Sequence, residues 1–262
     1  MNDIDIQYIC DTAVKAGTEI LKIYETNFSV SYKEHDQSPL TQADLGAHEI
    51  IARELAGKYP DIPILSEEGK LTPYENRKLW SRFWLIDPLD GTKEFVDKSG
   101  DFTVNIALIE KQTPVLGVVY APVKGLLYYA QKGTGAYRII HGQTSEKLPC
   151  TNVPAKRQKK LVVASKHHMS GETQKYIDLT YGNSENYELV SVGSSLKFCL
   201  VAEGTADMYP RLGPTMEWDT AAAHAIILES GKTVHIIHEG RDSGKSLVYN
   251  KENLLNPWFV VS

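Results

Sequence analysis

Acidic side chains stand at three places where an apolar run ends or a helix is expected to begin. Glu67 and Glu68 follow the run "IPIL" after one serine, Asp87 and Asp90 follow "FWLI", and Asp219 lies in "EWDTAAAHAIILESG". Hard divalent cations prefer oxygen ligands, mostly carboxylates and carbonyls. A buried carboxylate without a partner is costly. These acids are therefore either exposed to solvent or bound to a cation.

The segment "DPLDGT", residues 87–92, favours binding. Pro88 lacks an N–H and stiffens the turn, so the carbonyl of Leu89 can point inward as a further oxygen ligand. Gly91 permits a positive φ and the close approach of an anion. A helix that begins at Thr92 would direct its free N–H groups toward a phosphate. An ordinary pair of Asp-Pro and Asp-Gly turns is the alternative interpretation.

Other phosphate chemistries have signatures that this sequence lacks. It contains no G-x-x-x-x-G-K-[ST] loop, no G-x-G-x-x-G fingerprint and no G-x-S-x-G elbow. A covalent aspartyl phosphatase would place its two aspartates two residues apart, whereas Asp87 and Asp90 are three apart with a proline between them. The spacing favours attack by a metal-activated water over a covalent intermediate.

Composition and charge exclude several other classes of protein. The chain has 262 residues, enough for one large α/β domain or two closely packed halves. Its net charge of −5 offers no basic surface for nucleic acid. The first ten residues lack the basic start of a signal peptide, and no apolar run approaches the roughly 20 residues of a membrane span. Three widely spaced cysteines favour neither a disulfide framework nor a zinc cluster, so we expect a reducing cytoplasm.

The elements that must position the acids can be predicted from periodicity. Apolar residues at spacings of three and four predict a helix over 6–25. Thr41 and Asp44 match a capping signature and predict a second helix from 41, which gives Asp44 an ordinary structural role as its alternative. Short strands are expected at 62–65 and 83–86, and turn residues then divide an antiparallel meander over 103–139.

From residue 161 onward, expected strands and helices alternate, which predicts a layered α/β arrangement. The last of these helices begins near residue 218, and an acid such as Asp219 in a first turn also has the ordinary role of stabilising the helix dipole. Residues 147–160 hold two prolines and a basic run. They form the predicted boundary between halves 1–150 and 151–262, packed as one unit.

At these acidic segments the chain resembles the Mg²⁺-dependent, lithium-sensitive inositol monophosphatase superfamily. The segments "ILSEEG", "WLIDPLDGTKEF" and "EWDTAAAHAIILESG" carry the likeness. Within the superfamily, "SPLTQADLGAH", "GDFTVNIALIE" and "VGSSLKFCLVAEGTADMYPRLGPTMEWDTAA" are similar to the bacterial 3'(2'),5'-bisphosphate nucleotidases. The resemblance implies an α-β-α-β-α sandwich and hydrolysis of 3'-phosphoadenosine 5'-phosphate to AMP and phosphate.

The resemblance also implies roles for individual residues. Two Mg²⁺ ions would be held by Glu67, Asp87, the Leu89 carbonyl, Asp90 and Asp219. A third, weaker ion would lie near Glu67. Asp44 and Thr92 would orient the attacking water, with Glu67 as a further catalytic group. The amides of Gly91 and Thr92 would hold the scissile phosphate.

Substrate contacts are implied in two further segments and at Asp219. Ser165 and His168 would contact the nucleoside, with His167 competing for the second role. A second phosphate would be held by the segment that contains Gly193, Ser194, Ser195 and Lys197, because a lysine suits phosphate as a point charge. An exposed lysine at 197 and a plain loop histidine at 168 are the ordinary alternatives.

Two other functions stay open at this point. One is an inositol monophosphate or fructose bisphosphate phosphatase; the Ser-Ser-Leu-Lys segment favours a second phosphate and so argues against inositol monophosphate. The other is a non-catalytic, metal-dependent nucleotide sensor. In each case we expect a small-molecule partner, no nucleic acid, no integral membrane segment and a monomer or weak homodimer. The expected location is the cytoplasm, with the surface of the inner membrane as an alternative.

Overall fold

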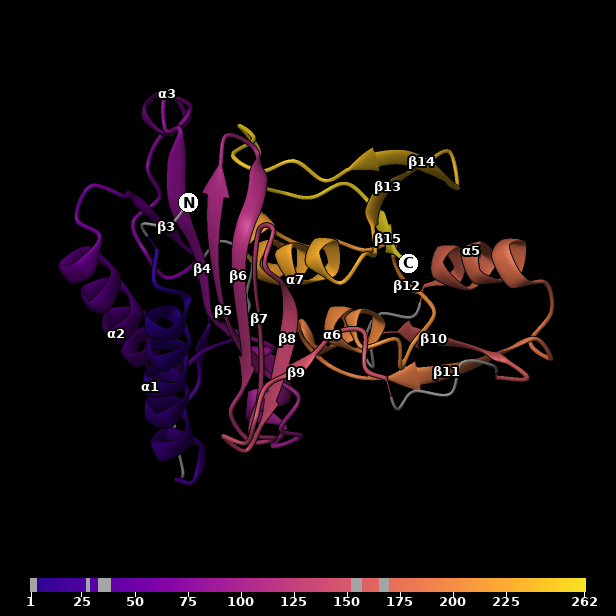
Figure 1. The fold of residues 1–262 in the computed structure, drawn as a ribbon, viewed down its shortest axis with the longest axis horizontal. Coiled ribbons are helices and arrows are strands. Elements are labelled where there is room, and N and C mark those ends of the chain that lie inside the picture. The colour runs from indigo at the N-terminus through magenta and orange to yellow at the C-terminus, as the bar shows by residue number, and fades with distance from the viewer. Residues whose placement is uncertain (1–3, 27–28, 33–38, 152–156, 165–169) are drawn as a thin grey trace.

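The chain folds into five alternating layers of helices and strands. The computed structural model describes residues 4–26, 29–32, 39–151, 157–164 and 170–262. Two helices cover one face of a large sheet, two more cover its other face, and a second group of strands with one outer helix completes the stack (Figure 1). The α-β-α-β-α sandwich expected from the resemblance is therefore confirmed.

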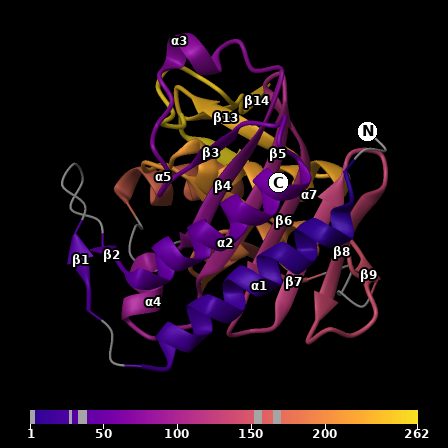
Figure 2. The same ribbon diagram turned by 90° about the vertical axis from the view of Figure 1, so that its left-hand side faces the viewer.

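The outer helical layer consists of α1 (Ile6–Tyr24) and α2 (Gln42–Lys58), which lie side by side across the sheet (Figure 2). Apolar residues of α1 such as Ile9 and Ile20 are fully buried against the strands. A capping box formed by Thr41 and Asp44 begins α2, as the sequence predicts. The short strands β1 (Ser31–Tyr32) and β2 (Pro39–Leu40), which follow α1 and precede α2 in the chain, pair with each other.

The large sheet has seven strands in the order β3-β4-β5-β6-β7-β8-β9. Their bounds are β3 Ile64–Ser66, β4 Arg82–Asp90, β5 Thr103–Glu110, β6 Thr113–Ala121, β7 Leu126–Gln131, β8 Gly135–Ile140 and β9 Glu146–Lys147. The first pair is parallel and the others are antiparallel, so the predicted meander is confirmed. The short helices α3 (Tyr74–Arg77) and α4 (Thr92–Val96) flank β4 in the chain.

The sequence predicts a strand that ends just before Asp87, whereas β4 is longer. It continues to Asp90, since Asp87 pairs with Asn105 and Asp90 pairs with Thr103. Between these two pairs the chain advances three residues in β4 but only two in β5. The extra residue is accommodated as a bulge, which tolerates a proline that cannot donate a ladder hydrogen bond. The predicted turn is therefore a bulged strand end, and it brings both aspartates to the same edge of the sheet.

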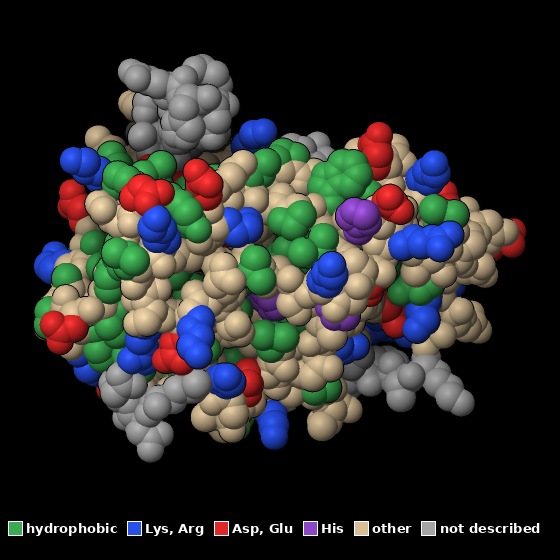
Figure 3. All heavy atoms as spheres, turned by 90° about the horizontal axis from the view of Figure 1, so that it is seen from above, with side chains coloured by type: hydrophobic (Ala, Val, Ile, Leu, Met, Phe, Trp, Pro, Cys, Tyr) green, Lys and Arg blue, Asp and Glu red, His purple; other side chains and the backbone are tan. Residues whose placement is uncertain are grey.

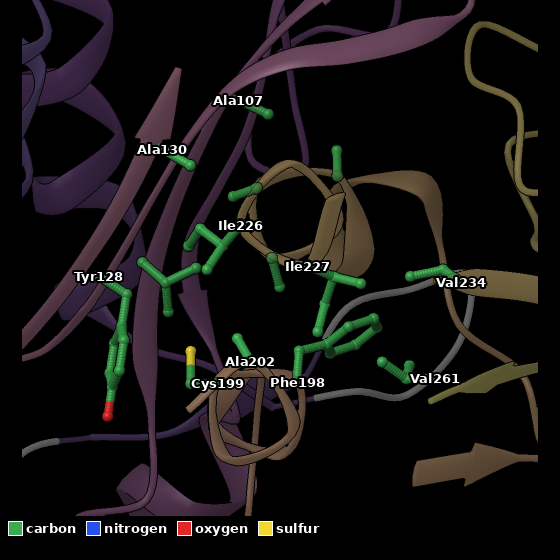
Figure 4. Packing of buried hydrophobic residues seen from close by; sticks show 14 of the residues in the cluster. Ala107, Tyr128, Ala130, Phe198, Cys199, Ala202, Ile226, Ile227, Val234 and Val261 are labelled. Carbon is green, nitrogen blue, oxygen red and sulfur yellow. The ribbon is translucent and has the colours of Figure 1, made fainter. Parts of the chain in front are cut away.

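The middle helical layer consists of α6 (Leu196–Ala202) and α7 (Glu217–Glu229). A Cβ added to Gly117 of β6 would lie 2.0 Å from the carbonyl oxygen of Ala222, so only glycine permits this approach of α7 to the sheet. Figure 4 shows Ile226 directed toward the sheet and Phe198 packed below α7. This cluster contains residues of both predicted halves, while the boundary at 150 stays a prediction.

The far layers contain a four-stranded sheet, a parallel strand pair and one helix. The sheet has the order β12 (Tyr209–Arg211), β15 (Phe259–Val261), β13 (Val234–His238) and β14 (Arg241–Ser246). The parallel pair is β10 (Lys160–Ala164) with β11 (Tyr187–Ser191), and α5 (Gly171–Tyr181) packs outside. Among the described helices, none combines the length and the apolar character needed to cross a bilayer. On the face in Figure 3, the described charged side chains of both signs are interspersed.

Candidate metal and phosphate site

Three carboxylates from distant parts of the sequence meet at one edge of the large sheet. Glu67, Asp87 and Asp219 each offer an oxygen, and these atoms lie within 4.8 Å of one another. The parallel pairing of β3 with β4 brings the first two together, since the Glu67 N–H donates to the Ile86 carbonyl at 3.1 Å. The first turn of α7 supplies Asp219 from the layer below. The structure therefore gathers the three acidic segments of the sequence.

The electrostatics of this cluster favour a bound cation. Burial raises the pKa of Asp87 well above its usual value, and the charges of Glu67, Asp90 and Asp219 raise it further. Burial and then the charges of Asp90 and Glu67 also raise the pKa of Asp219. Asp90 and Asp219 keep some surface open toward a cavity, yet protein atoms surround both closely enough to disfavour their ionised forms. A cation among these groups would reverse this cost.

The donor set fits a hard divalent cation. All three carboxylates present oxygen, and oxygen-only sets suit Mg²⁺, Ca²⁺ or Mn²⁺ better than zinc. The Asn105 side chain is buried beside the cluster, where its amide nitrogen lies 3.4 Å from Asp90 Oδ2. Its Oδ1 has no hydrogen-bond partner within the described part of the chain. Sequence reasoning missed Asn105, because a polar residue in a strand has no local signal of burial.

Asp44 and Thr92 are 48 residues apart in the sequence, and the fold brings them together beside the bulged end of β4. The Thr92 hydroxyl lies 3.3 Å from Asp44 Oδ1 and 3.4 Å from the Leu89 carbonyl oxygen, so either oxygen can accept a hydrogen bond from it. The other Asp44 oxygen accepts from the Thr41 N–H at 2.8 Å and from the Thr41 hydroxyl at 2.6 Å. Asp44 thus has its capping role and also contacts Thr92, so the two interpretations of this acid are compatible.

Two glycines lie close to the same backbone carbonyl, that of Asp101. Gly91 has φ of +94° and begins α4, and a Cβ at this position would lie 3.3 Å from the Asp101 carbonyl oxygen. A Cβ at Gly193 would lie 2.6 Å from the same oxygen. The Gly193 N–H donates to Asp101 Oδ2 at 3.4 Å. A side chain at Gly193 would therefore displace the backbone of Asp101, while one at Gly91 would be strained by its positive φ. The shared contact with Asp101 brings residue 193 next to residue 91.

Ser195 and Lys197 lie at the start of α6 and face the acidic cluster. The Ser195 hydroxyl donates to the Asp219 carbonyl at 2.8 Å and accepts from Asn105 at 3.1 Å. Lys197 is buried and its ammonium group lies 5.6 Å from the centre of the Tyr209 ring, which excludes the exposed-lysine alternative. Burial lowers the pKa of Lys197 to about 8, although the charge of Asp90 opposes this change.

A cavity of about 120 Å³ lies between the cluster and α6. Its lining comprises Asp90, Gly91, Glu94, Ser194, Ser195, Lys197, Phe198, Tyr209, Arg211, Thr215, Asp219 and Thr220. Arg211 of this lining was not predicted, although it directly follows the apolar end of an expected strand, as the acids do. Ser165, His167 and His168 fall outside the described residues.

Known proteins resemble this chain along nearly its whole length. The inositol monophosphatase family profile matches residues 3–257. A relative named 3'(2'),5'-bisphosphate nucleotidase CysQ from Salmonella typhimurium is 44% identical over 98% of this chain and 99% of its own length. The protein of the same name from Escherichia coli K12 is 42% identical with the same coverage.

Solved structures extend the likeness to three dimensions. The crystal structure of CysQ from Bacteroides thetaiotaomicron has a TM-score of 0.84 and 47% identity, covering 98% of this chain and 96% of its own. An inositol monophosphatase structure from Thermotoga maritima has a TM-score of 0.74 at 25% identity, covering 98% of this chain and 91% of its own.

Proposed function

This chain belongs to the inositol monophosphatase family, a family of metal-dependent phosphatases, and on that premise we propose that it is a Mg²⁺-dependent 3'(2'),5'-bisphosphate nucleotidase. It hydrolyses 3'-phosphoadenosine 5'-phosphate to AMP and phosphate. Likeness along the whole chain to proteins named for this activity supports the proposal. The observation that carries it is the cavity that joins the acidic cluster to two cationic side chains, Lys197 and Arg211.

We assign two Mg²⁺ ions to the acidic cluster. Glu67, Asp87 and the Leu89 carbonyl would hold one, while Asp87, Asp90 and Asp219 would hold the other, and a third, weaker ion would lie near Glu67. The crowding of the carboxyl groups and their raised pKa values support this assignment. When bound, Mg²⁺ supplies positive charge that polarises the phosphate and lowers the pKa of a water molecule.

The residues around the bulge of β4 orient the reacting groups. When the Thr92 hydroxyl donates to Asp44, its oxygen is free to accept a hydrogen bond from the attacking water. Asp44 is itself fixed by Thr41, which holds the pair in place. The positive φ of Gly91 lets the backbone of residues 91 and 92 approach the scissile phosphate, whose oxygens accept from N–H groups of the first turn of α4.

The cationic side of the cavity would hold the second phosphate. Lys197 is buried there, and a phosphate beside it would raise its lowered pKa and keep the ammonium charged. Arg211 adds a guanidinium, which suits phosphate oxygens. The Ser194 hydroxyl is buried without a partner among the described residues, so it can donate to the same ligand. The Ser195 hydroxyl, also in the cavity lining, is held by Asp219 and Asn105.

A substrate panel tests the proposal. We expect kcat/KM for 3'-phosphoadenosine 5'-phosphate to exceed that for inositol 1-phosphate and fructose 1,6-bisphosphate by at least about 100-fold, because only a matched second phosphate engages both cations. Activity should disappear in EDTA, return with Mg²⁺ and fall with Li⁺. Preference for inositol 1-phosphate would point to the monophosphatase, and tight nucleotide binding without phosphate release would point to the sensor.

Two further expectations accompany this function. We place the enzyme in the cytoplasm, with attachment to the surface of the inner membrane as the alternative, and as a monomer or weak homodimer. Both stay predictions from the sequence.

A further inference from the structure

The first turn of α7, which carries Asp219, is held by a later segment of the chain. We call residues 249–256 the C-terminal brace. Glu217 is fully buried, and its Oε2 accepts from the Asn250 N–H at 2.6 Å. Its Oε1 accepts from the Lys251 N–H at 2.9 Å and from the Lys251 ammonium at 2.6 Å. One carboxylate therefore receives three hydrogen bonds from the brace.

The brace also holds the backbone around this turn. The Glu217 N–H donates to the Leu254 carbonyl at 2.9 Å, and the Asn256 N–H donates to the Thr215 carbonyl at 2.8 Å. The Asn256 side chain donates to the Met216 carbonyl at 2.8 Å. The first contact satisfies an N–H of the helix's first turn that has no partner within the helix, and the other two fix the backbone just before it. The position of the turn is thus set from outside the helix.

A second attachment connects the brace to the segment that follows Glu67. Arg77 is buried at the end of α3 and donates to Asn250 Oδ1 at 2.8 Å and to the Glu252 carbonyl at 2.7 Å. Asn250 returns a hydrogen bond to the Arg77 carbonyl at 2.8 Å. The chain runs from Glu67 to Arg77 within ten residues. The brace therefore contacts both the start of α7, which carries Asp219, and the helix α3, which follows Glu67 in the chain.

We propose that Glu217 is a positioning residue that sets the orientation of Asp219, an inference that rests on the proposed function. Side chains two positions apart on a helix point to opposite sides. Anchoring Glu217 to the brace therefore fixes the rotation at which Asp219 faces the cluster, where Asp219 Oδ2 also accepts from the Met216 N–H at 2.9 Å. A buried ion pair adds little net stability over an apolar pair, so the value of Glu217 and Lys251 lies in geometry.

The test compares Mg²⁺ binding in Glu217→Gln and wild type by calorimetry and by the Mg²⁺-dependent shift in Tm. The variant keeps the shape of the side chain but loses the charge and one acceptor. We expect its Mg²⁺ dissociation constant to rise about 10–100-fold, the usual effect of losing support around a metal ligand. The kcat measured at saturating Mg²⁺ should fall less than the Mg²⁺ affinity does.

The matched control is Glu203→Gln, at the other end of α6 from Ser195. Glu203 is also buried and accepts from Tyr128 at 2.7 Å and from Arg138 at 2.6 Å. This control should lower Tm but leave Mg²⁺ affinity within about twofold. Equal losses of Tm in both variants with unchanged Mg²⁺ affinity would overturn the inference.

Two further measurements keep the test decisive. If Glu217→Gln does not fold, Lys251→Met can be measured in its place, because it removes the ammonium paired with Glu217 and should weaken Mg²⁺ binding. Lys251→Arg keeps a positive charge and should bind Mg²⁺ as wild type does. An unchanged Mg²⁺ affinity in Lys251→Met would refute the positioning role of Glu217. If wild type itself binds no Mg²⁺, the proposed function fails instead.

Discussion

Replacing Asp87 with asparagine should stabilise the metal-free protein and abolish its response to Mg²⁺. The carboxyl group is buried among three other acids, so its charge costs folding free energy when no cation is present. Asparagine keeps the oxygen that accepts from the Leu89 N–H at 3.1 Å, so the bulge of β4 should survive. The substitution therefore removes charge with little change in shape.

The size of the effect follows from the spacing of the charges. At 4.8 Å, two full charges in an effective dielectric of about 20 repel by about 3.5 kcal/mol. Because the cluster of the wild type takes up a proton, much of this repulsion is already relieved. The free energy of unfolding of the variant should therefore exceed that of the wild type by about 1–3 kcal/mol. For a chain of 262 residues that corresponds to a rise in Tm of roughly 2–6 °C.

The pH dependence has a definite sign. The pKa of Asp87 in the folded protein is raised above the ordinary 3.8, so its contribution to stability is fully present below 3.8 and is lost as the pH rises through the raised value. In EDTA, Asp87→Asn should therefore match wild type in acid and exceed it increasingly toward pH 8.

The assay is calorimetric melting at pH 8, in EDTA and in excess Mg²⁺, with phosphate release measured in parallel. Wild type should gain Tm with Mg²⁺, whereas the variant should gain none and turn over roughly 10³-fold more slowly. Asp61→Asn, at an exposed aspartate before β3, is the control and should change stability by less than about 0.5 kcal/mol. A lower Tm for Asp87→Asn in EDTA together with an intact Mg²⁺ response would refute the reasoning.

Three other substitutions test separate parts of the structure. Lys197→Met should lower kcat/KM for the nucleoside bisphosphate about 30–100-fold but spare a monophosphate, and equal losses for both substrates would argue against a second phosphate site. Thr92→Val should slow turnover while calorimetry shows Mg²⁺ binding unchanged; lost binding would instead make Thr92 part of the metal site. Gly117→Ala should cost about 1–3 kcal/mol in denaturant unfolding because its Cβ meets Ala222, whereas Gly57→Ala in α2 has open space and should be neutral or stabilising.

Local patterns were sufficient to predict most of the large sheet and its covering helices. The capping box of Thr41 and Asp44 and the turn residues of the meander act over a few positions, so the sequence displays them directly. The strand β14 was not predicted, because its residues 241–246 are polar and mostly exposed and depend on pairing with β13. The bulge of β4 was missed since it depends on the register of β5.

The same distinction between local patterns and distant contacts applies to the candidate site. Its acids could be found because carboxylates after apolar runs are unusual within a short window. Asn105 could not, since nothing near it in the sequence shows that folding brings it to the cluster. Arg211 follows an apolar run as the acids do, but the sequence does not show that this run ends beside the cavity. Glu217 was also missed, because the partners that bury it lie 33 and 34 residues further along the chain.

The place of β15 in the smaller sheet has a consequence for how the protein is made. Residues 259–261 lie between β12 and β13, so the last described strand to be synthesised is an interior strand. Glu67 and Asp87 leave the ribosome long before it, but the brace that holds Asp219 is translated just ahead of it. We therefore expect the smaller sheet, and with it the support of the turn that carries Asp219, to form only after residues 249–261 have emerged from the ribosome.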